Sequence, residues 1–241
     1  MAAVQQTIIP FNVKDFNFGK KLGENSLGDI YAAVESSTRN IYGIKVINKN
    51  NLHAPARANQ VLEKLSSLGH KNIAKIIGVI EISDKIYILL EPASFGTLSA
   101  YFGKGFEVSE EKAEQKAKDL FRQIVTGIHY LHSNKVAHCG LNPTSIMVGS
   151  NDTVKLIDAG LGPLCIEHSL IERNFVAPET VNNNYNGFKA DIYSLGIIFR
   201  YILNELHAPM TPECITLFEK LTSDPTVRPS AGALLKDNWL A

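Results

Sequence analysis

Two segments near the start of the chain have residue types that can hold a phosphate group. Gly23 and Gly28 frame the segment Gly23-Glu-Asn-Ser-Leu-Gly28 between two strand-like runs. Glycines there let a hairpin fold over phosphates with its backbone N–H groups facing them. Lys45 lies inside an apolar strand-like run, where its ammonium group needs a partner. Each feature alone also fits an ordinary hairpin turn or a lysine at a sheet edge, so both interpretations stay open.

A series of short motifs later in the chain favours the phosphate interpretation. In chain order they are His138-Cys-Gly-Leu-Asn-Pro143, Ser145-Ile-Met-Val148, Val154-Lys-Leu-Ile-Asp158-Ala-Gly160, Ala177-Pro-Glu179, Ala190-Asp191 and Asp224-Pro-Thr-Val-Arg228-Pro229. Their joint order and spacing resemble the eukaryotic protein kinase domain from about residue 16 to residue 240. The resemblance implies a bilobal, protein-kinase-like α+β fold. A small lobe would hold an antiparallel β-sheet and one helix, and a larger lobe would be mainly helical.

The resemblance also implies a site for ATP and Mg²⁺. Gly23 and Gly28 match the first and third glycines of the phosphate-covering loop, while Asn25 replaces the second and crowds the approach to the phosphates. Lys45 matches the lysine that pairs with the α- and β-phosphates, and Asp158 matches the magnesium-binding aspartate. The other nucleotide-binding candidates are Ile30, Gly43 and Met147 around adenine, Leu90 as gatekeeper, and Glu91 and Ala93 in the hinge.

Two positions of the expected site lower the predicted affinity for the nucleotide. Thr97 stands where a ribose-binding carboxylate is common in the family, so a ribose contact is not expected. Asp158 also fits a turn-capping aspartate and is a weak candidate for Mg²⁺. Binding of ATP is therefore expected to be weak or absent.

The catalytic loop departs most from the family pattern. The catalytic aspartate falls on Gly140, the adjacent arginine on Cys139, the lysine that contacts the γ-phosphate on Asn142, and the asparagine that holds the second magnesium ion on Ser145. A positioned acid or base contributes ~10²–10⁴-fold to a rate, so its loss costs roughly 3–5 kcal/mol of barrier. No nearby carboxylate is an obvious substitute, and Asp152 is expected to be a solvated loop residue.

Substitutions in the first helix and beside Asp158 also favour an impaired site. The glutamate that normally pairs with the lysine falls on Val61, and Glu63 would reach Lys45 only from a rotated or shifted helix. Ala159 replaces the phenylalanine that joins an apolar stack between the lobes, whose other members are Leu65, Ile76 and His138. These changes predict a loosely coupled or locked inactive arrangement.

The sequence therefore favours a pseudokinase, a kinase fold that is not an enzyme and acts as a scaffold or allosteric binding module. One alternative is an atypical, slow Ser/Thr protein kinase that uses Lys45 and Asp158. Another is a regulatory module that senses nucleotide. Within the family, the small lobe and the Asp224-to-Pro229 motif are most similar to the NimA-related (NEK) group. Because Cys139 replaces the arginine, activation by phosphorylation of the segment from Asp158 to Glu179 is not expected.

Other motif residues are expected to support the fold. Glu179 and Arg228 match a buried salt bridge, and Asp191 matches the residue that braces the backbone of the catalytic loop. His138 is expected to be a packed, hydrogen-bonded histidine. The pair formed by His129 and His132 invites a metal-site interpretation, but the family pattern makes that reading the weaker one.

The elements that must position these residues change character near residue 92. Five strand-like runs and one helical stretch with Pro55 near its start precede that point, and helical periodicity follows it. Ser109 is a reasonable start for a long amphipathic helix. We expect one domain over residues 1–241, with an N-lobe at about 11–91, a hinge at 92–97 and a C-lobe at 98–241 that is shortened between 203 and 224.

Composition limits the classes of partner. The chain has 241 residues, 45% of them hydrophobic and 20% charged, with 24 basic and 24 acidic residues and no net charge. A chain without a basic surplus favours neither nucleic acid nor an anionic membrane as its partner. The three cysteines have no metal-ligand spacing, and the N-terminus lacks a signal-peptide pattern. We expect an intracellular, cytoplasmic protein with a protein partner, and association with the cytoskeleton through that partner stays open.

Overall fold

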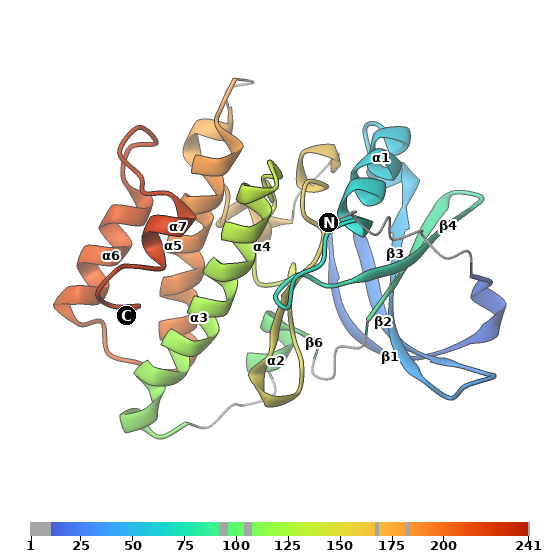
Figure 1. Cartoon of the computed structure of the whole chain (residues 1–241), viewed down its shortest axis with the longest axis horizontal. Coiled ribbons are helices and arrows are strands. Elements are labelled where there is room, and N and C mark those ends of the chain that lie inside the picture. The colour runs from blue at the N-terminus through green and yellow to red at the C-terminus, as the bar shows by residue number, and fades with distance from the viewer. Residues whose placement is uncertain (1–10, 92–95, 104–107, 167–168, 182–183, 241) are drawn as a thin grey trace, which may run out of the picture.

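The computed structural model describes residues 11–91, 96–103, 108–166, 169–181 and 184–240. The chain forms two lobes, one built on a twisted sheet and one built on helices, with a few short elements between them (Figure 1). The α+β, bilobal architecture expected from the sequence is confirmed. The expected hinge at 92–97 lies partly outside the described residues, since only Gly96 and Thr97 of that range are described.

The N-lobe is a five-stranded antiparallel sheet with strand order β1-β2-β3-β5-β4. Its strands are β1 (Phe16–Asn25), β2 (Gly28–Glu35), β3 (Ile41–Asn48), β4 (Ile76–Ile82) and β5 (Lys85–Leu90). Two short 3₁₀ helices, Val13–Asp15 and Lys49–Asn51, precede β1 and follow β3. Lys45 lies in the centre of the sheet, opposite Ile30 on β2 and Ile88 on β5. The register thus fixes the one charged side chain of β3 in an apolar environment.

Helix α1 (Pro55–Ser66) covers this sheet, with Pro55 in the first turn. Proline is well suited to that position because its missing N–H has no helical partner there. The buried side chains of α1, at positions that include Leu62 and Leu65, recur at helical spacing. One face of the helix is therefore held toward the region where the two lobes meet.

The C-lobe is organised around two long helices, α3 (Glu110–Ser133) and α5 (Gly187–Glu205). Both are buried along much of their length, and α5 is apolar almost all round. Phe121, Phe199 and Trp239 form an aromatic cluster that joins α3 and α5 to the end of the chain. The smaller helices of this lobe are α2 (Leu98–Phe102), α4 (Leu170–Arg173), α6 (Pro212–Thr222) and α7 (Ala231–Leu234), with 3₁₀ turns at Gly162–Leu164 and Pro178–Val181.

A small antiparallel sheet, β6-β7-β8, lies between the lobes. It comprises β6 (Gly96–Thr97), β7 (Ile146–Val148) and β8 (Val154–Leu156), with a 3₁₀ turn at Ser150–Asp152 between the last two. Strand β8 is tied to the N-lobe because Ala74 N donates to Leu156 O at 2.9 Å and Leu156 N donates to Asn72 O at 2.9 Å. Asp158 follows directly, so its position is set by both lobes.

Between residues 203 and 224, the region expected to be short, the chain ends α5, makes a brief connection and forms α6. No helix of the described residues is long and apolar enough to cross a membrane.

The salt bridge expected in the C-lobe is confirmed. Arg228 donates two hydrogen bonds to the carboxylate of Glu179, one of them at 3.0 Å, and further bonds to the carbonyls of Ser223 and Lys189. Burial alone would raise the pKa of Glu179, but the hydrogen bonds from Arg228 outweigh it and lower that pKa below its ordinary value of 4.5. The contribution of this carboxyl to stability is therefore complete above pH 4.5 and is lost as the pH falls through the lowered pKa.

We expect Glu179→Ala to lower the free energy of unfolding by about 3–5 kcal/mol, because it leaves the buried Arg228 guanidinium without its counter-charge. Urea unfolding followed by circular dichroism measures this change. The control is Lys220→Ala, which breaks the exposed pair between Lys220 and Asp237 and should cost no more than about 1 kcal/mol. An equal loss of unfolding free energy in the two variants would show that the buried pair stabilises the fold no more than an exposed pair does.

Candidate functional site

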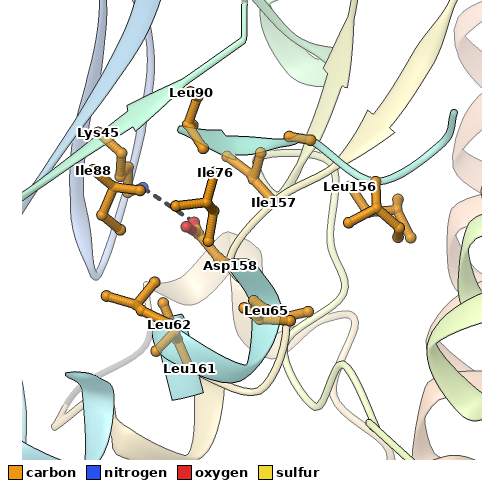
Figure 2. A pocket seen from close by; sticks show the side chains of 13 residues that line it. Lys45, Leu62, Leu65, Ile76, Ile88, Leu90, Leu156, Ile157, Asp158 and Leu161 are labelled. Atoms are coloured by element: carbon orange, nitrogen blue, oxygen red, sulfur yellow. Dashed lines mark ion pairs between the residues drawn. The ribbon is translucent and has the colours of Figure 1, made fainter. Parts of the chain in front are cut away.

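The centre of the site is a buried ion pair between Lys45 of β3 and Asp158 of the turn after β8. Lys45 Nζ lies 3.1 Å from Asp158 Oδ2, and the two side chains are 1% and 6% exposed. Apolar side chains from α1, β4 and β5 surround the pair, as Figure 2 shows. Asp158 has a positive φ of 63°, a conformation that aspartate tolerates better than most residues. The structure therefore brings together the two charged groups that the resemblance assigned to phosphate and metal binding.

Asn25, at the end of β1, bridges the two charged groups. Its Oδ1 accepts a hydrogen bond from Lys45 Nζ at 2.6 Å, and its Nδ2 donates to Asp158 Oδ2 at 2.8 Å. The same Oδ1 accepts from the backbone N–H groups of Leu27 and Gly28. From the sequence, Asn25 is expected only to crowd the approach to the phosphates. In the structure it is the polar partner of both charges and pins the glycine-containing turn onto them.

The two glycines of that turn are needed for close packing. Gly28 has a φ of 151°, and a Cβ there would lie 1.9 Å from Val46 O. A Cβ on Gly23 would lie 2.3 Å from Thr97 Cγ2. Thr97 is itself buried, and its hydroxyl accepts a hydrogen bond from Ala100 N at the start of α2. The turn is thus folded closely over the small sheet between the lobes.

The residues assigned to adenine come together in one apolar cluster. Ile30, Leu90 and Met147 are buried members of it. Gly43 lies close to Leu90 and to the carbonyl of Glu91, so β3 leaves space beside that carbonyl. Glu91 N donates to Lys75 O, and the Glu91 carboxylate pairs with Lys155. The backbone N–H of Glu91 is therefore already used, and Ala93 lies outside the described residues.

The catalytic loop has a glycine at position 140, and the Asp191 side chain holds the backbone of the loop. His138 N and Cys139 N each donate to the carboxylate of Asp191 at 2.7 Å. This confirms the bracing role expected for Asp191. A Cβ on Gly140 would lie 3.1 Å from the Cα of Gly162, so the segment after Asp158 packs directly on the loop.

Asn142 and Ser145 are engaged in the turn of the loop itself. Ser145 Oγ donates to Asn142 O at 2.9 Å and accepts from Asn142 N at 3.0 Å. Asn142 Nδ2 donates to Gly140 O, and its Oδ1 accepts from Thr144. Both side chains are buried. In this arrangement the two residues stabilise the loop.

The first helix places an apolar residue where the family has its glutamate. Val61 lies close to Gly160, because a Cβ on that glycine would be 3.3 Å from Val61 Cγ1. Glu63 is exposed, and the ion pair of Lys45 is made with Asp158. Ala159 is buried in the cluster that includes Leu65 and Ile76. A cavity of about 20 Å³ remains beside Ala159, where a larger side chain would fill space.

The structure changes the expectations for Asp152 and His138 in part. Asp152 is partly exposed, as expected for a loop residue, but it is also held in place, because it accepts from Tyr101 Oη at 2.7 Å and pairs with Lys116. His138 is packed as expected, but neither nitrogen of its ring has a hydrogen-bond partner. His132 Nε2 lies 2.9 Å from Asp191 Oδ2, and no cluster of three metal-ligating side chains occurs among the described residues.

Glu172 is the residue that sequence reasoning missed. It lies on α4, lines the same small cavity as Gly140 and Asp158, and is only 5% exposed. Its carboxylate accepts hydrogen bonds from the backbone and hydroxyl of Ser26, in the turn that also holds Asn25. No local motif marks this position, because the contact joins segments that are far apart in the sequence.

Comparison with known proteins supports the architecture and the site. A sequence model of the protein kinase domain matches residues 16–212. "Serine/threonine protein kinase OSK3" of Oryza sativa subsp. indica is 29% identical over 236 residues, which cover 93% of this chain and 46% of the relative. Human "NUAK family SNF1-like kinase 2" is 34% identical over 197 residues, covering 78% of this chain and 30% of that protein. "CBL-interacting protein kinase 24" of Oryza sativa subsp. japonica is 28% identical over 219 residues, 86% of this chain and 47% of the relative.

The chain thus spans less than half of the length of these curated relatives. Their names belong to other groups than the NimA-related kinases, so the resemblance to that group stays a prediction.

The expectation that the chain is not an enzyme is wrong. The relatives reported above are all named as kinases, OSK3 as a serine/threonine protein kinase, and the Lys45–Asp158 pair that serves phosphate and metal binding in such enzymes is intact. With the family model matching residues 16–212 and the site built on that pair, this chain belongs to the protein kinase domain family.

Proposed function

We propose that the chain is an atypical Ser/Thr protein kinase of low activity, which transfers the γ-phosphoryl group of MgATP with the help of Lys45 and Asp158. The observation that carries the proposal is the buried 3.1 Å contact between these two side chains. Support for Ser/Thr specificity comes from the name of the relative OSK3, a serine/threonine protein kinase. The accepting partner would be a protein with a serine or threonine hydroxyl.

The chemistry of the two side chains suits the two parts of the substrate. A lysine ammonium attracts phosphate oxygens, and a carboxylate is a ligand that Mg²⁺ accepts together with substrate phosphates. Phosphoryl transfer depends mainly on positioning and charge neutralisation. Charges in a site shielded from water act more strongly than they would in solution. Both groups lie in such a setting, since apolar side chains surround them.

The same structure supports a low rate. Gly140 offers no carboxylate, and the side chains of Asn142 and Ser145 are used within their own loop. The cavities beside the ion pair have volumes of about 20 Å³, whereas sites for small molecules measure ~300–1,000 Å³. The glycine-containing turn must therefore lift before phosphates can reach Lys45 and Asp158, which lowers the apparent affinity for ATP.

A second candidate function, the sensing of nucleotide, is favoured by the contacts of that turn. Asn25 holds the turn to Lys45 and Asp158, and Ser26 holds it to Glu172 on α4. A nucleotide that displaced Asn25 would release both contacts together. Binding of a nucleotide in the cleft would in this way change the surface of the segment that carries α4.

Purified wild-type chain incubated with radiolabelled MgATP and a general Ser/Thr acceptor protein is expected to transfer label slowly. Asp158→Asn and Lys45→Met should each lower the rate at least about tenfold, because each removes one of the two charges that position the phosphates. Exposed residues supply the matched controls, Asp84→Asn and Lys112→Met, which should leave the rate unchanged. Transfer that is unaffected by Asp158→Asn would contradict the proposal.

Asn25→Gly is expected to strengthen ATP binding by about tenfold, because it removes the side chain that bridges Lys45 and Asp158 and lets the backbone approach the phosphates. A ligand that binds the folded state raises its melting temperature by mass action, so the variant should show a larger Mg²⁺-dependent shift with ATP. Asn17→Gly, in the same strand but paired with Ser36, corrects for the intrinsic cost of glycine in a strand. If ATP shifts wild type and Asn25→Gly equally, Asn25 does not block the site.

A further inference from the structure

A second small cavity borders Gly140 on the side of the catalytic loop that faces the glycine-containing turn. Three segments meet there: the turn with Asn25 and Ser26, the loop with Gly140, and the segment after Asp158 with Gly162 and Glu172. The volume is about 20 Å³, which is room for roughly one water molecule. A hydroxyl that accepts phosphate in this family must reach the neighbourhood of position 140, so the polar groups of this cavity decide what happens to its proton.

The backbone of the segment after Asp158 packs closely against position 140. A Cβ on Gly140 would lie 3.1 Å from the Cα of Gly162, and a Cβ on Gly162 would lie 2.2 Å from Cys139 O. A side chain at position 140 would therefore have to displace the backbone near Gly162 by a few tenths of an ångström. The same segment then continues into α4 and brings Glu172 to the cavity.

Glu172 is held in this cavity as a hydrogen-bonded carboxylate. Its Oε1 accepts from Ser26 N at 3.1 Å, and its Oε2 accepts from Ser169 N at 2.7 Å and from the hydroxyl of Ser26. Burial alone would raise the pKa of Glu172, but the bonds from Ser26 and Ser169 outweigh it and lower the pKa below its ordinary value of 4.5. The group is therefore ionised at neutral pH and able to accept a proton.

The other carboxylates near the catalytic loop are already engaged. Asp158 is paired with Lys45, and both oxygens of Asp191 accept hydrogen bonds from the backbone of the loop. Asp152 pairs with Tyr101 and Lys116. The partners of Glu172 are a hydroxyl and two backbone N–H groups, so its oxygen already receives a hydrogen bond from the type of group that a Ser/Thr kinase must deprotonate.

We propose that Glu172 is the proton acceptor of this enzyme and takes the role that the missing side chain at position 140 has in its relatives. In the step, the hydroxyl oxygen of the substrate serine or threonine forms a bond to the γ-phosphorus of ATP. The bond from that phosphorus to the β,γ-bridging oxygen breaks, and its electron pair leaves with ADP. The hydroxyl proton moves to Glu172 Oε2 and is later released to water. The inference rests on the proposed function.

Ser26 occupies the position that the substrate hydroxyl would take beside Glu172. Its hydroxyl is bound to the oxygen that would receive the substrate's proton, so the turn must lift Ser26 away before a substrate hydroxyl can bind. The lift also frees Asn25 from Lys45 and Asp158. Ser26 is thus a competitor of the substrate and takes no part in the transfer itself.

The test is steady-state phosphoryl transfer by the whole chain, with kcat and the KM for ATP measured separately. Glu172→Gln keeps the size of the side chain but replaces one acceptor oxygen with an NH₂ group, so it can accept from only one of the backbone N–H groups of Ser26 and Ser169. We expect a lower melting temperature, and kcat is therefore measured below it and per mole of folded chain. We expect the kcat of this variant to fall ~10²-fold, the lower end of the contribution of a general base, with an unchanged KM for ATP. The matched control, Glu219→Gln on the exposed face of α6, should behave as wild type.

Two further variants separate proton transfer from a structural role. Glu172→Ala should regain activity when formate is added, because a free carboxylate can enter the space left by the side chain and accept the proton. Ser26→Ala should keep the wild-type kcat or exceed it, since it removes the competing hydroxyl. If Ser26→Ala loses as much activity as Glu172→Gln, or if formate has no effect on Glu172→Ala, Glu172 only fastens the turn and the inference is wrong.

The outcome also distinguishes this inference from the function on which it rests. If wild type transfers label in a manner that depends on Asp158 but Glu172→Gln matches wild type, the proposed function stands and the role of Glu172 is contradicted. If wild type itself shows no transfer that depends on Asp158, the proposed function fails and the role of Glu172 fails with it.

Discussion

The buried contact between Lys45 and Asp158 constrains the rest of this structure. Taking one charge out of water is costly, and a buried charge persists only with an opposite charge and good hydrogen bonds. Lys45 reaches its partner because β3 lies in the middle of the sheet, and Asp158 reaches it because β8 is bonded to the backbone between α1 and β4. The two lobes therefore meet at this buried ion pair.

Closure of the site follows from the same contact. Buried charges need hydrogen bonds as well as each other, and the carboxamide of Asn25 supplies an acceptor to Lys45 and a donor to Asp158. Ser26 extends the closure to Glu172 on α4. Glycine at position 28 makes the turn possible because its φ of 151° and its close approach to Val46 leave no space for a side chain. Lys45 and Asp158, which mark the candidate site, therefore also hold the glycine-containing turn over it.

Much of this architecture could be predicted from the sequence. Strands β3 and β4 run over the predicted residues, and α1 begins at Pro55, because alternating or helical apolar patterns are local signals. Lys45, Asp158, Asp191 and the Glu179–Arg228 pair could be placed because the motifs around them keep a fixed spacing. What the motifs could not show is the conformation of side chains that join distant segments. The bridge made by Asn25, the burial of Glu172 and the pairing of Asp152 with Lys116 all depend on tertiary contacts.

The expectation that the chain is not an enzyme was wrong because it also depended on tertiary contacts. The sequence shows which groups are missing at their usual positions, but it does not show which groups from elsewhere in the chain fill the space. The most direct test of the central claim, that Lys45 and Asp158 form a working site for MgATP, is a calorimetric titration of the wild-type chain and Lys45→Met with ATP. We expect Mg²⁺-dependent heat of binding for wild type that is lost in Lys45→Met. Absence of any binding to wild type at millimolar ATP, or equal binding by the variant, would contradict it.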